Sequence, residues 1–584
     1  MADPIRIANC SGFFGDRLSA AREMVEGGPI DVLTGDWLAE LTMLILARTR
    51  VKRPNGGYAR TFVTQMEQVM GTCLDRGIKV VSNAGGLDPK GCADGVAEVA
   101  DKLGLHPKIA YVDGDDLMPR IDELLRDDQI RHFETGDPIK EADFLTANAY
   151  LGCWGIVDAL NRGADIVITG RATDAAIVCG PAAWHHGWSR GDWNQLAGAV
   201  AAGHVIECGT QATGGNYSFF TEVEGLTHTG FPFAEVAEDG SSVIGKHEGT
   251  GGEVSIGTVT SQLLYEISGP EYFGPDVTTR FDTIELEQEG PDRVRMHGIQ
   301  GEPPPSTLKV CINRSGGFRN SMTACLTGLD IEAKAKLIED AFWASCPYSP
   351  SDYAQVTTAL VRTDQADPES NEQAVALFRI TVKDPDDKKT GRAFANAMTE
   401  LALSTIPGFF GVGGGPAGGR PFGVYVPACI PAEHVTQNVV LLGGDAHQVS
   451  SVIPPADASV TPAAERGGAA PEGATRRLPL GTVFGTRSGD KGGNANLGVF
   501  ARTDEAWAWI DEFLTEDRLR ELLPEIAEMP VDRHRLPGLR SLNFLIHGLL
   551  EEGVAASTRQ DGQAKSLGEW LRARHVDLPE ALLP

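Results

Sequence analysis

Five segments of the sequence combine glycine with a carboxylate or amide side chain, and each follows a run of apolar residues. They are 9–16, 35–37, 83–88, 113–116 and 170–174. Glycine lets backbone amides approach a ligand closely, and a carboxyl group with a pKa near neutrality can transfer protons. Aspartate or asparagine before a helix is also a common N-cap, so each segment alone is consistent with ordinary capping. Together the five segments predict a ligand site at the carboxyl ends of a set of strands.

The first three segments supply candidate substrate-binding residues, namely Gly12, Asp16, Asp36, Asn83, Gly85 and Gly86. The backbone amides of residues 83–86 could hold the oxygen of an enolate. In the fifth segment, Arg171 can pair with a carboxylate or phosphate in fork geometry, and Thr173 is a further binding candidate. Asp174 is a candidate acid or base, and the alternative for Thr173 and Asp174 is a capped helix.

Glu207 is the second candidate acid or base, because it precedes a polar glycine-rich segment after an apolar run. His204 lies three positions earlier. In a helix the two side chains would share one face, whereas in a strand they would point to opposite faces. Further ligands for a metal ion are not evident beside them, so no metal site is predicted.

The segment 485–496 is rich in glycine and carries Arg487, Ser488 and Lys491. Such a backbone with nearby cations can form an anion-binding nest. The segment looks too long and too polar for a plain hairpin turn, so a binding or interface loop between two strands is expected. Arg487 and Lys491 are its candidate contacts to a substrate.

The first third of the chain alternates β-branched apolar runs with amphipathic stretches, which predicts a parallel sheet covered on both faces. Strands are expected at 5–8, 30–34, 78–82, 108–112 and 165–169, and helices at 18–25, 37–48, 62–74, 92–103 and 144–161. The predicted fold class is α/β, with an open doubly wound, Rossmann-like sheet. A closed barrel of alternating strands and helices is the alternative.

The predicted domain organisation changes after about residue 217. Residues 1–217 form the α/β part of a region that reaches residue 453, and 218–453 form an α+β lobe in which 254–266 is expected to be a strand. Residues 454–477 are a linker rich in Pro, Ala and Gly. Residues 478–584 form a small α+β domain.

The composition excludes several classes of protein. Lys and Arg number 51 against 80 Asp and Glu, giving a formal charge of −29, which argues against nucleic-acid and anionic membrane partners. The sequence shows no apolar run long enough for a spanning helix, and its start does not resemble a signal peptide. Its 10 cysteines form no CxxC pair, which favours a reducing, cytoplasmic location. Gly12 and Gly15 do not complete a dinucleotide-binding fingerprint, and a P-loop is absent.

Several long motifs resemble the AtuA family of acyclic terpene utilisation proteins. They are 7–17, 34–40, 82–86, 169–174 and 486–496. The resemblance spans nearly the whole chain and implies a ferredoxin-like fold for residues 478–584. It further implies breakdown of branched isoprenoid acids as coenzyme A thioesters, beside a biotin carboxylase and an enoyl-CoA hydratase. A lyase or hydratase acting on a branched 3-hydroxyacyl-CoA is the expected activity, with coenzyme A as part of the substrate and any separate cofactor unknown.

Two other functions remain open at this point. The protein could be a non-catalytic accessory subunit associated with an acyl-CoA carboxylase, or, as a weaker alternative, an NAD-dependent oxidoreductase. A homo-oligomer is the default expectation for a large acidic enzyme.

Overall fold

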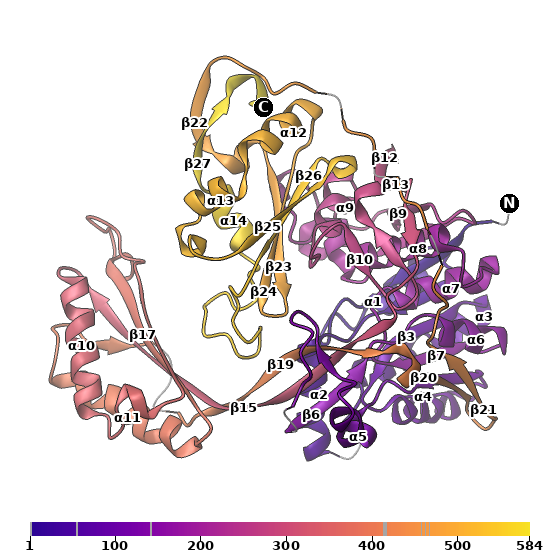
Figure 1. Ribbon diagram of the computed structural model, residues 1–584, viewed down its shortest axis with the longest axis horizontal. Helices are drawn as coiled ribbons and strands as arrows, with labels where there is room; N and C mark the ends of the chain where they lie inside the picture. Colours follow the sequence, from indigo (N-terminus) through magenta and orange to yellow (C-terminus); the bar gives the residue numbers. More distant parts are fainter. Residues whose placement is uncertain are drawn as a thin grey trace. The chain divides into compact units, whose positions relative to one another are not determined.

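The computed structural model describes residues 3–53, 56–140, 143–412, 417–456, 458–461, 463–466 and 468–584. The protein has a mixed α/β fold with several sheets (Figure 1). It forms two compact units. The first comprises residues 1–313, 425–554 and 561–584, and the second comprises 314–424 and 555–560. No helix among the described residues is both long enough and apolar enough to cross a bilayer.

The largest sheet of the described residues contains eleven strands and belongs to the first unit. In spatial order they are β12 (Glu285–Gly290), β13 (Arg293–His297), β9 (Ser242–Lys246), β8 (Pro232–Val236), β1 (Ile5–Asn9), β2 (Val32–Gly35), β3 (Lys79–Gly86), β7 (Ile166–Gly170), β4 (Ile109–Asp113), β20 (Thr436–Leu441) and β21 (Ala446–Ser450). Neighbouring strands from β1 to β4 pair in parallel, whereas the outer strands pair antiparallel. The carboxyl ends of the parallel strands therefore meet at one edge.

Helices cover the parallel strands on both faces, because successive side chains of each strand enter different cores. In β7, Ile166 and Ile168 pack in one apolar core, and Val167 packs in another. The first core includes side chains of α1 (Ala20–Gly27), α3 (Arg60–Arg76) and α4 (Pro89–Leu103). The second core includes α6 (Trp154–Asn161), α7 (Ala176–His186) and α8 (Trp193–Ile206). Together the two cores hold the strand ends at a fixed edge.

The predictions of one helix and of one strand are wrong. Residues 144–161, expected to be one helix, form β6 (Phe144–Ala149) followed by α6. The segment between these elements contains Gly152, where a Cβ atom would lie 2.2 Å from the Asp276 carboxylate. Residues 254–266, expected to be a strand, contain α9 (Ile256–Leu263), because Ser255 caps its first turn in a capping box with Thr258.

The second unit is built on the distal part of β15 (Thr307–Thr327), with β17 (Val375–Asp384) and β16 (Gln355–Val361) beside it. Helices α10 (Ile331–Ser345) and α11 (Phe394–Thr399) contribute to its apolar core. The chain leaves this unit within β19 (Arg420–Pro431).

The C-terminal segment of the first unit contains an antiparallel sheet in the order β23 (Gly485–Lys491), β24 (Asn494–Phe500), β26 (Ser541–Ile546) and β25 (Val531–Leu536). Its core includes α12 (Asp504–Phe513), α13 (Glu516–Leu522) and α14 (Leu567–Arg572). The strand pair β22 (Thr475–Pro479) and β27 (His575–Pro579) completes it. Of the predicted linker 454–477, residues Asp457, Pro462 and Gly467 lie outside the described residues.

The expected loop at 485–496 is instead a hairpin. Residues Gly485–Lys491 pair antiparallel with Asn494–Phe500, and the turn between them is Gly492–Gly493. Gly492 has a φ of 64°, which a two-residue hairpin turn of this kind requires. The polar residues of the segment therefore project from strands.

Replacing Ile168 by Ala tests the packing of the parallel sheet. Its side chain is fully buried in β7 between β3 and β4, so truncation should lower the free energy of unfolding by about 2–5 kcal/mol. Urea denaturation followed by circular dichroism measures this change. Leu103→Ala, at a side chain that is 41% exposed, is the control and should cost far less. An equal loss in both variants would contradict the described core.

Candidate functional site

A cavity of about 810 Å³ opens in the first unit at the carboxyl ends of the parallel strands. Eight of the residues singled out in the sequence line it, namely Gly12, Asp16, Asp36, Arg171, Thr173, Asp174, Glu207 and Lys491. They come from the ends of β1, β2 and β7, from the end of α8, and from β23. Segments distant in the sequence thus meet at one cavity, which we take as the candidate site.

Arg171 is the most buried cation of the cavity, with 2% of its surface exposed. Its Nη1 donates a hydrogen bond of 2.7 Å to Asp174 Oδ1, and its guanidinium carbon lies 4.1 Å from the centre of the Tyr150 ring. Its backbone N–H donates to Asp115 at the end of β4. These contacts fix the side chain at the cavity wall.

Lys309 approaches the same Tyr150 ring, with its Nζ 4.7 Å from the ring centre. Lys309 Nζ and the Tyr150 hydroxyl both donate to Glu40 Oε1, at 3.0 and 2.8 Å. Burial by itself would raise the pKa of Glu40, but the charges of Lys309 and Arg171 outweigh it and lower this pKa below its usual range. Glu40 is therefore a carboxylate that neutralises cations.

Asp36 lines the cavity, and the side chain of Asn83 fixes its carboxyl group. Asn83 Nδ2 donates to Asp36 Oδ1, and Asn83 Oδ1 accepts from the backbone N–H of Trp37 at 2.9 Å. Burial, and then the charge of Asp174, raise the pKa of Asp36, while the charge of Arg171 opposes this. Asp36 is thus a carboxyl group shifted toward its protonated form.

Asn83, Gly85 and Gly86 are not among the residues that line the cavity. Strand β3 continues through Gly86, so these residues pack against protein. At Gly85, a Cβ atom would lie 2.4 Å from the carbonyl oxygen of Thr169. The structure therefore gives Asn83 a positioning contact to Asp36 and gives Gly85 a packing contact to β7.

The turn after β1 closes against the end of α8. A Cβ atom at Gly12 would lie 2.5 Å from the backbone carbon of Cys208, which only glycine accommodates without a shift. The Gly12 N–H donates to Asp16 Oδ2 at 2.9 Å, and Asp16 Oδ1 accepts from the N–H of Arg17 at 2.7 Å. Asp16 therefore orders this turn at the cavity.

His204 and Glu207 lie on one face at the C-terminal end of α8, which decides between the helix and strand alternatives. His204 Nδ1 is 3.3 Å from Glu207 Oε1, and the two residues are 1% and 6% exposed. Asn9 Nδ2 donates to the backbone oxygen of Glu207 at 3.1 Å. In the part of the chain that the structure describes, no three His, Cys, Asp or Glu side chains are arranged to hold a metal ion.

The C-terminal hairpin brings Lys491 into the cavity, where its Nζ donates to the backbone oxygen of Glu266 at 2.7 Å. Burial, and then the charge of Lys309, lower the pKa of Lys491. Arg487 does not line the cavity itself. Its guanidinium covers the Tyr265 ring at 4.2 Å and donates to Gln211. Arg487 thus supports residues that line the cavity.

Among the cavity residues that were not expected from the sequence are Glu40, Tyr150 and Lys309. Lys309 lies in β15 between Leu308 and Val310, both buried. A lysine in such an apolar strand indicates a charged partner, since a lysine that is partly removed from water, as Lys309 is, needs one. The other two offered no comparable local signal.

Exposed aromatic side chains also line the cavity. Phe13, Phe133 and Phe273 are 60%, 50% and 59% exposed, and all three line it. Exposed aromatic side chains gathered at one cavity commonly mark a binding surface. The cavity therefore offers charged groups and apolar surface to the same ligand.

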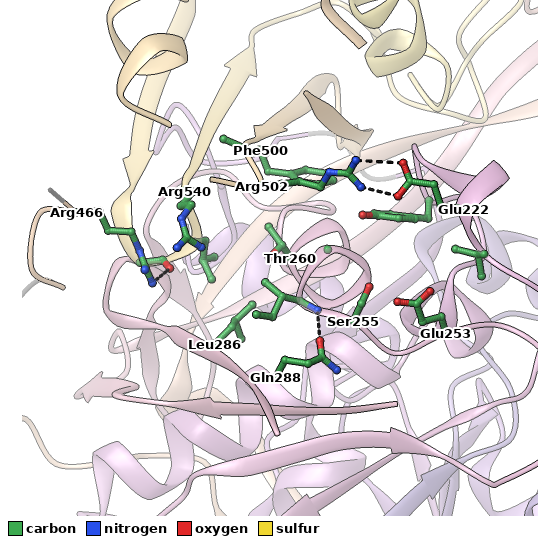
Figure 2. Close-up of a pocket in the computed structure, with 17 residues that line it drawn as sticks. Glu222, Glu253, Ser255, Thr260, Leu286, Gln288, Arg466, Phe500, Arg502 and Arg540 are labelled. Carbon is green, nitrogen blue, oxygen red and sulfur yellow. Dashed lines mark hydrogen bonds and ion pairs between the residues drawn. The ribbon is translucent and has the colours of Figure 1, made fainter. Parts of the chain in front are cut away.

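Figure 2 shows a second, smaller cavity of about 290 Å³ in the same unit. Its Arg502 forms two bonds to Glu222, at 2.6 and 3.1 Å. Arg466 donates to the carbonyl oxygens of Pro537 and Gly538. The larger cavity is the better candidate, because the candidate residues Asp36, Arg171 and Glu207 line it and do not line the smaller one.

Replacing Lys309 by Met tests the charge balance around Glu40. A carboxyl group whose pKa is lowered by folding stabilises the protein above its ordinary pKa of about 4.3, and this contribution is lost as the pH falls. The variant should therefore unfold at a lower temperature than wild type at pH 7, and the deficit should persist down to about pH 4.3 and shrink as the pH falls below that value. Calorimetry across this range measures it.

Lys102→Met is the control for this experiment, because Lys102 pairs with Glu67 at the surface and is 67% exposed. Surface ion pairs contribute little to stability. A deficit for Lys309→Met that does not depend on pH would contradict the assigned role of Glu40.

Comparisons with known protein families identify both parts of the chain. Residues 5–441 match the family model described as acyclic terpene utilisation family protein AtuA. Residues 478–577 match the model of the AtuA ferredoxin-like domain. Neither a curated protein nor a solved structure matches the chain. The chain therefore belongs to the acyclic terpene utilisation family AtuA, which implies a role in acyclic terpene utilisation, and it carries the ferredoxin-like domain of that family.

Proposed function

We propose that this protein is an enzyme of isoprenoid and branched-chain acid breakdown that acts on a branched 3-hydroxyacyl thioester of coenzyme A by lyase or hydratase chemistry. The observation that carries the proposal is the large cavity, where buried carboxyl groups, cations and exposed aromatic side chains meet. Family membership supports the acyclic terpenoid character of the acid.

Both reactions require a proton to be removed or delivered near a thioester carbonyl group. Asp174 and Glu207 are the proposed acid and base groups, and both line the cavity. Burial, and then the charge of Asp174, raise the pKa of Glu207 well above its usual range. A carboxyl group that is protonated near neutral pH can donate a proton to carbon or oxygen.

The cations of the cavity are suited to the anionic and polar groups of such a substrate. The Arg171 Nε atom is buried and makes no hydrogen bond among the described residues. Arg171 and Lys309 share the Tyr150 ring, which keeps both charges at one wall. We assign them to a carboxylate or to the thioester oxygen, where charge develops during the reaction.

Three finer statements remain proposals. The parallel part of the large sheet is of a Rossmann-like kind. Residues 1–453 and 478–584 act as separate domains joined by the segment 454–477. Association into a homo-oligomer, or with acyl-CoA carboxylase subunits, would add partners that the site itself does not require.

Turnover of a panel of branched and terpenoid 3-hydroxyacyl-CoA thioesters tests the proposed function. Asp174→Asn and Glu207→Gln should each lower turnover by about 10²–10⁴-fold, the usual contribution of an acid or base group. The control is Asp94→Asn, at a side chain that is 48% exposed, which should keep full activity. An active wild-type enzyme whose turnover neither variant changes would falsify the acid and base assignment.

Replacing Phe273 by Ala tests the apolar part of the cavity. Loss of this aromatic surface should raise KM for long branched thioesters by about tenfold, equivalent to about 1.4 kcal/mol, and should affect short thioesters much less. Phe220→Ala is the matched control, since Phe220 is 60% exposed and does not line this cavity. Equal changes for short and long chains, measured by steady-state kinetics, would contradict chain binding at Phe273.

A further inference from the structure

The further inference concerns the pair formed by His204 and Glu207, and it rests on the proposed function. We propose that His204 and Glu207 are one catalytic acid–base pair, in which His204 accepts the proton of the substrate hydroxyl group and Glu207 delivers a proton to carbon. The two side chains lie 3.3 Å apart, Nδ1 to Oε1, on one face of α8, and both line the large cavity.

Unsatisfied polar atoms support a role toward a ligand. Both ring nitrogens of His204 and the Oε2 atom of Glu207 are buried and have no hydrogen-bond partner among the described residues. The Nδ1–Oε1 approach is close, but it is not aligned as a hydrogen bond. Buried polar atoms in folded proteins almost always have partners. Three such atoms on two adjacent side chains therefore mark a place where groups of a bound substrate complete the bonding.

Neighbouring residues hold the pair in place. The His204 ring lies 5.1 Å from the Tyr272 ring and 5.4 Å from the Phe281 ring, centre to centre. The Asn9 side chain bonds the backbone oxygen of Glu207. Because packed aromatic rings restrict the imidazole, its edge presents a fixed donor or acceptor to the cavity.

The electrostatic surroundings shift both groups toward their neutral forms. Burial, and then the charge of Lys491, lower the pKa of His204 to about 4. Burial, and then the charges of Asp174 and Glu266, raise the pKa of Glu207, while Lys491 opposes this shift. The pair is thus an imidazole that can accept a proton and a carboxyl group that is shifted toward its protonated, proton-donating form.

The lyase form of the reaction balances with these two groups, and Asp174 supports them because its charge raises the pKa of Glu207. His204 takes the proton from the 3-hydroxyl group, the bond between C2 and C3 breaks, and its electron pair passes to C2 as a thioester enolate. The C3 oxygen becomes a carbonyl oxygen, and Glu207 delivers its proton to C2. The imidazolium then returns a proton to the carboxylate across the short gap between them, which restores both neutral groups without an oxidant or reductant.

The test compares His204→Asn, Glu207→Gln and the double variant with wild type. Each single change should lower kcat by about 10²–10⁴-fold, and the double variant should lose about as much as the more impaired single variant, because the groups act as a unit. Thioester binding, measured by calorimetry, should change less than tenfold. The control is His228→Asn, which removes a surface histidine 3.5 Å from Glu23 and should leave turnover unchanged.

The pH profile separates catalysis from a purely structural role. Wild-type kcat should fall at alkaline pH as Glu207 ionises and at acid pH as His204 becomes protonated, whereas Glu207→Gln should lose the alkaline limb. The other charged or titratable groups that interact with the pair are Asp36, Asp174, Glu266, Lys491, Arg171, Tyr272 and Cys208. These residues are unchanged in all variants, so an alkaline limb that persists in Glu207→Gln belongs to one of them and overturns the pair.

The remaining outcomes distinguish the pair from the proposed function. An active wild type with fully active His204→Asn and His204→Gln variants overturns the pair and leaves the proposed function standing. Effects of the two single changes that multiply in the double variant also overturn the pair. A wild type that turns over none of the thioesters overturns the proposed function, and the pair falls with it. If His204→Asn lacks a cooperative thermal transition, His204→Gln supplies the same comparison.

Discussion

The buried guanidinium group of Arg171 is the charge on which the arrangement of the large cavity depends. A cation removed from water is strongly destabilising unless carboxylates and polar groups surround it. Asp174 bonds it directly, the Tyr150 ring covers it, and Asp115 fixes its backbone. The parallel strands can supply these partners because their carboxyl ends meet at one edge, where β2, β4 and β7 each deliver a polar turn. Arg171 also opposes the upward pKa shifts of Asp36 and Glu207.

The same constraint explains why the C-terminal segment contributes to the cavity. The large cavity brings carboxyl groups from the ends of the N-terminal strands close to that of Glu266, and these groups repel one another. Lys491 of β23 places a cation among them. Arg487 and Ser488 of the same strand bond Gln211 and the Ala564 carbonyl oxygen, which fixes the strand against its surroundings. The two regions matched by separate family models therefore complete one charged site.

The sequence identified part of this site because local patterns carry it. The pattern of glycine and carboxylate residues after apolar strands predicted that Asp36 and the turn at 170–174 belong to a ligand site. Both contribute residues that line the cavity. Asn83 was chosen by the same pattern, yet β3 continues past it and its amide bonds Asp36. The sequence did not predict the hairpin turn at Gly492, because the polar residues of the two strands that flank it are typical of a loop. Lys309 enters from a strand far along the chain, and its apolar neighbours in that strand indicate a partner but not that the partner is Glu40.

Photocrosslinking with a branched acyl-CoA that carries a reactive group at the end of its acyl chain tests the location of the site most directly. After digestion, mass spectrometry identifies the labelled residues. The account predicts labels near Phe13, Phe133 or Phe273, which an excess of the unmodified thioester should suppress. Labels confined to the smaller cavity around Arg502, or labels that competition does not suppress, would contradict it.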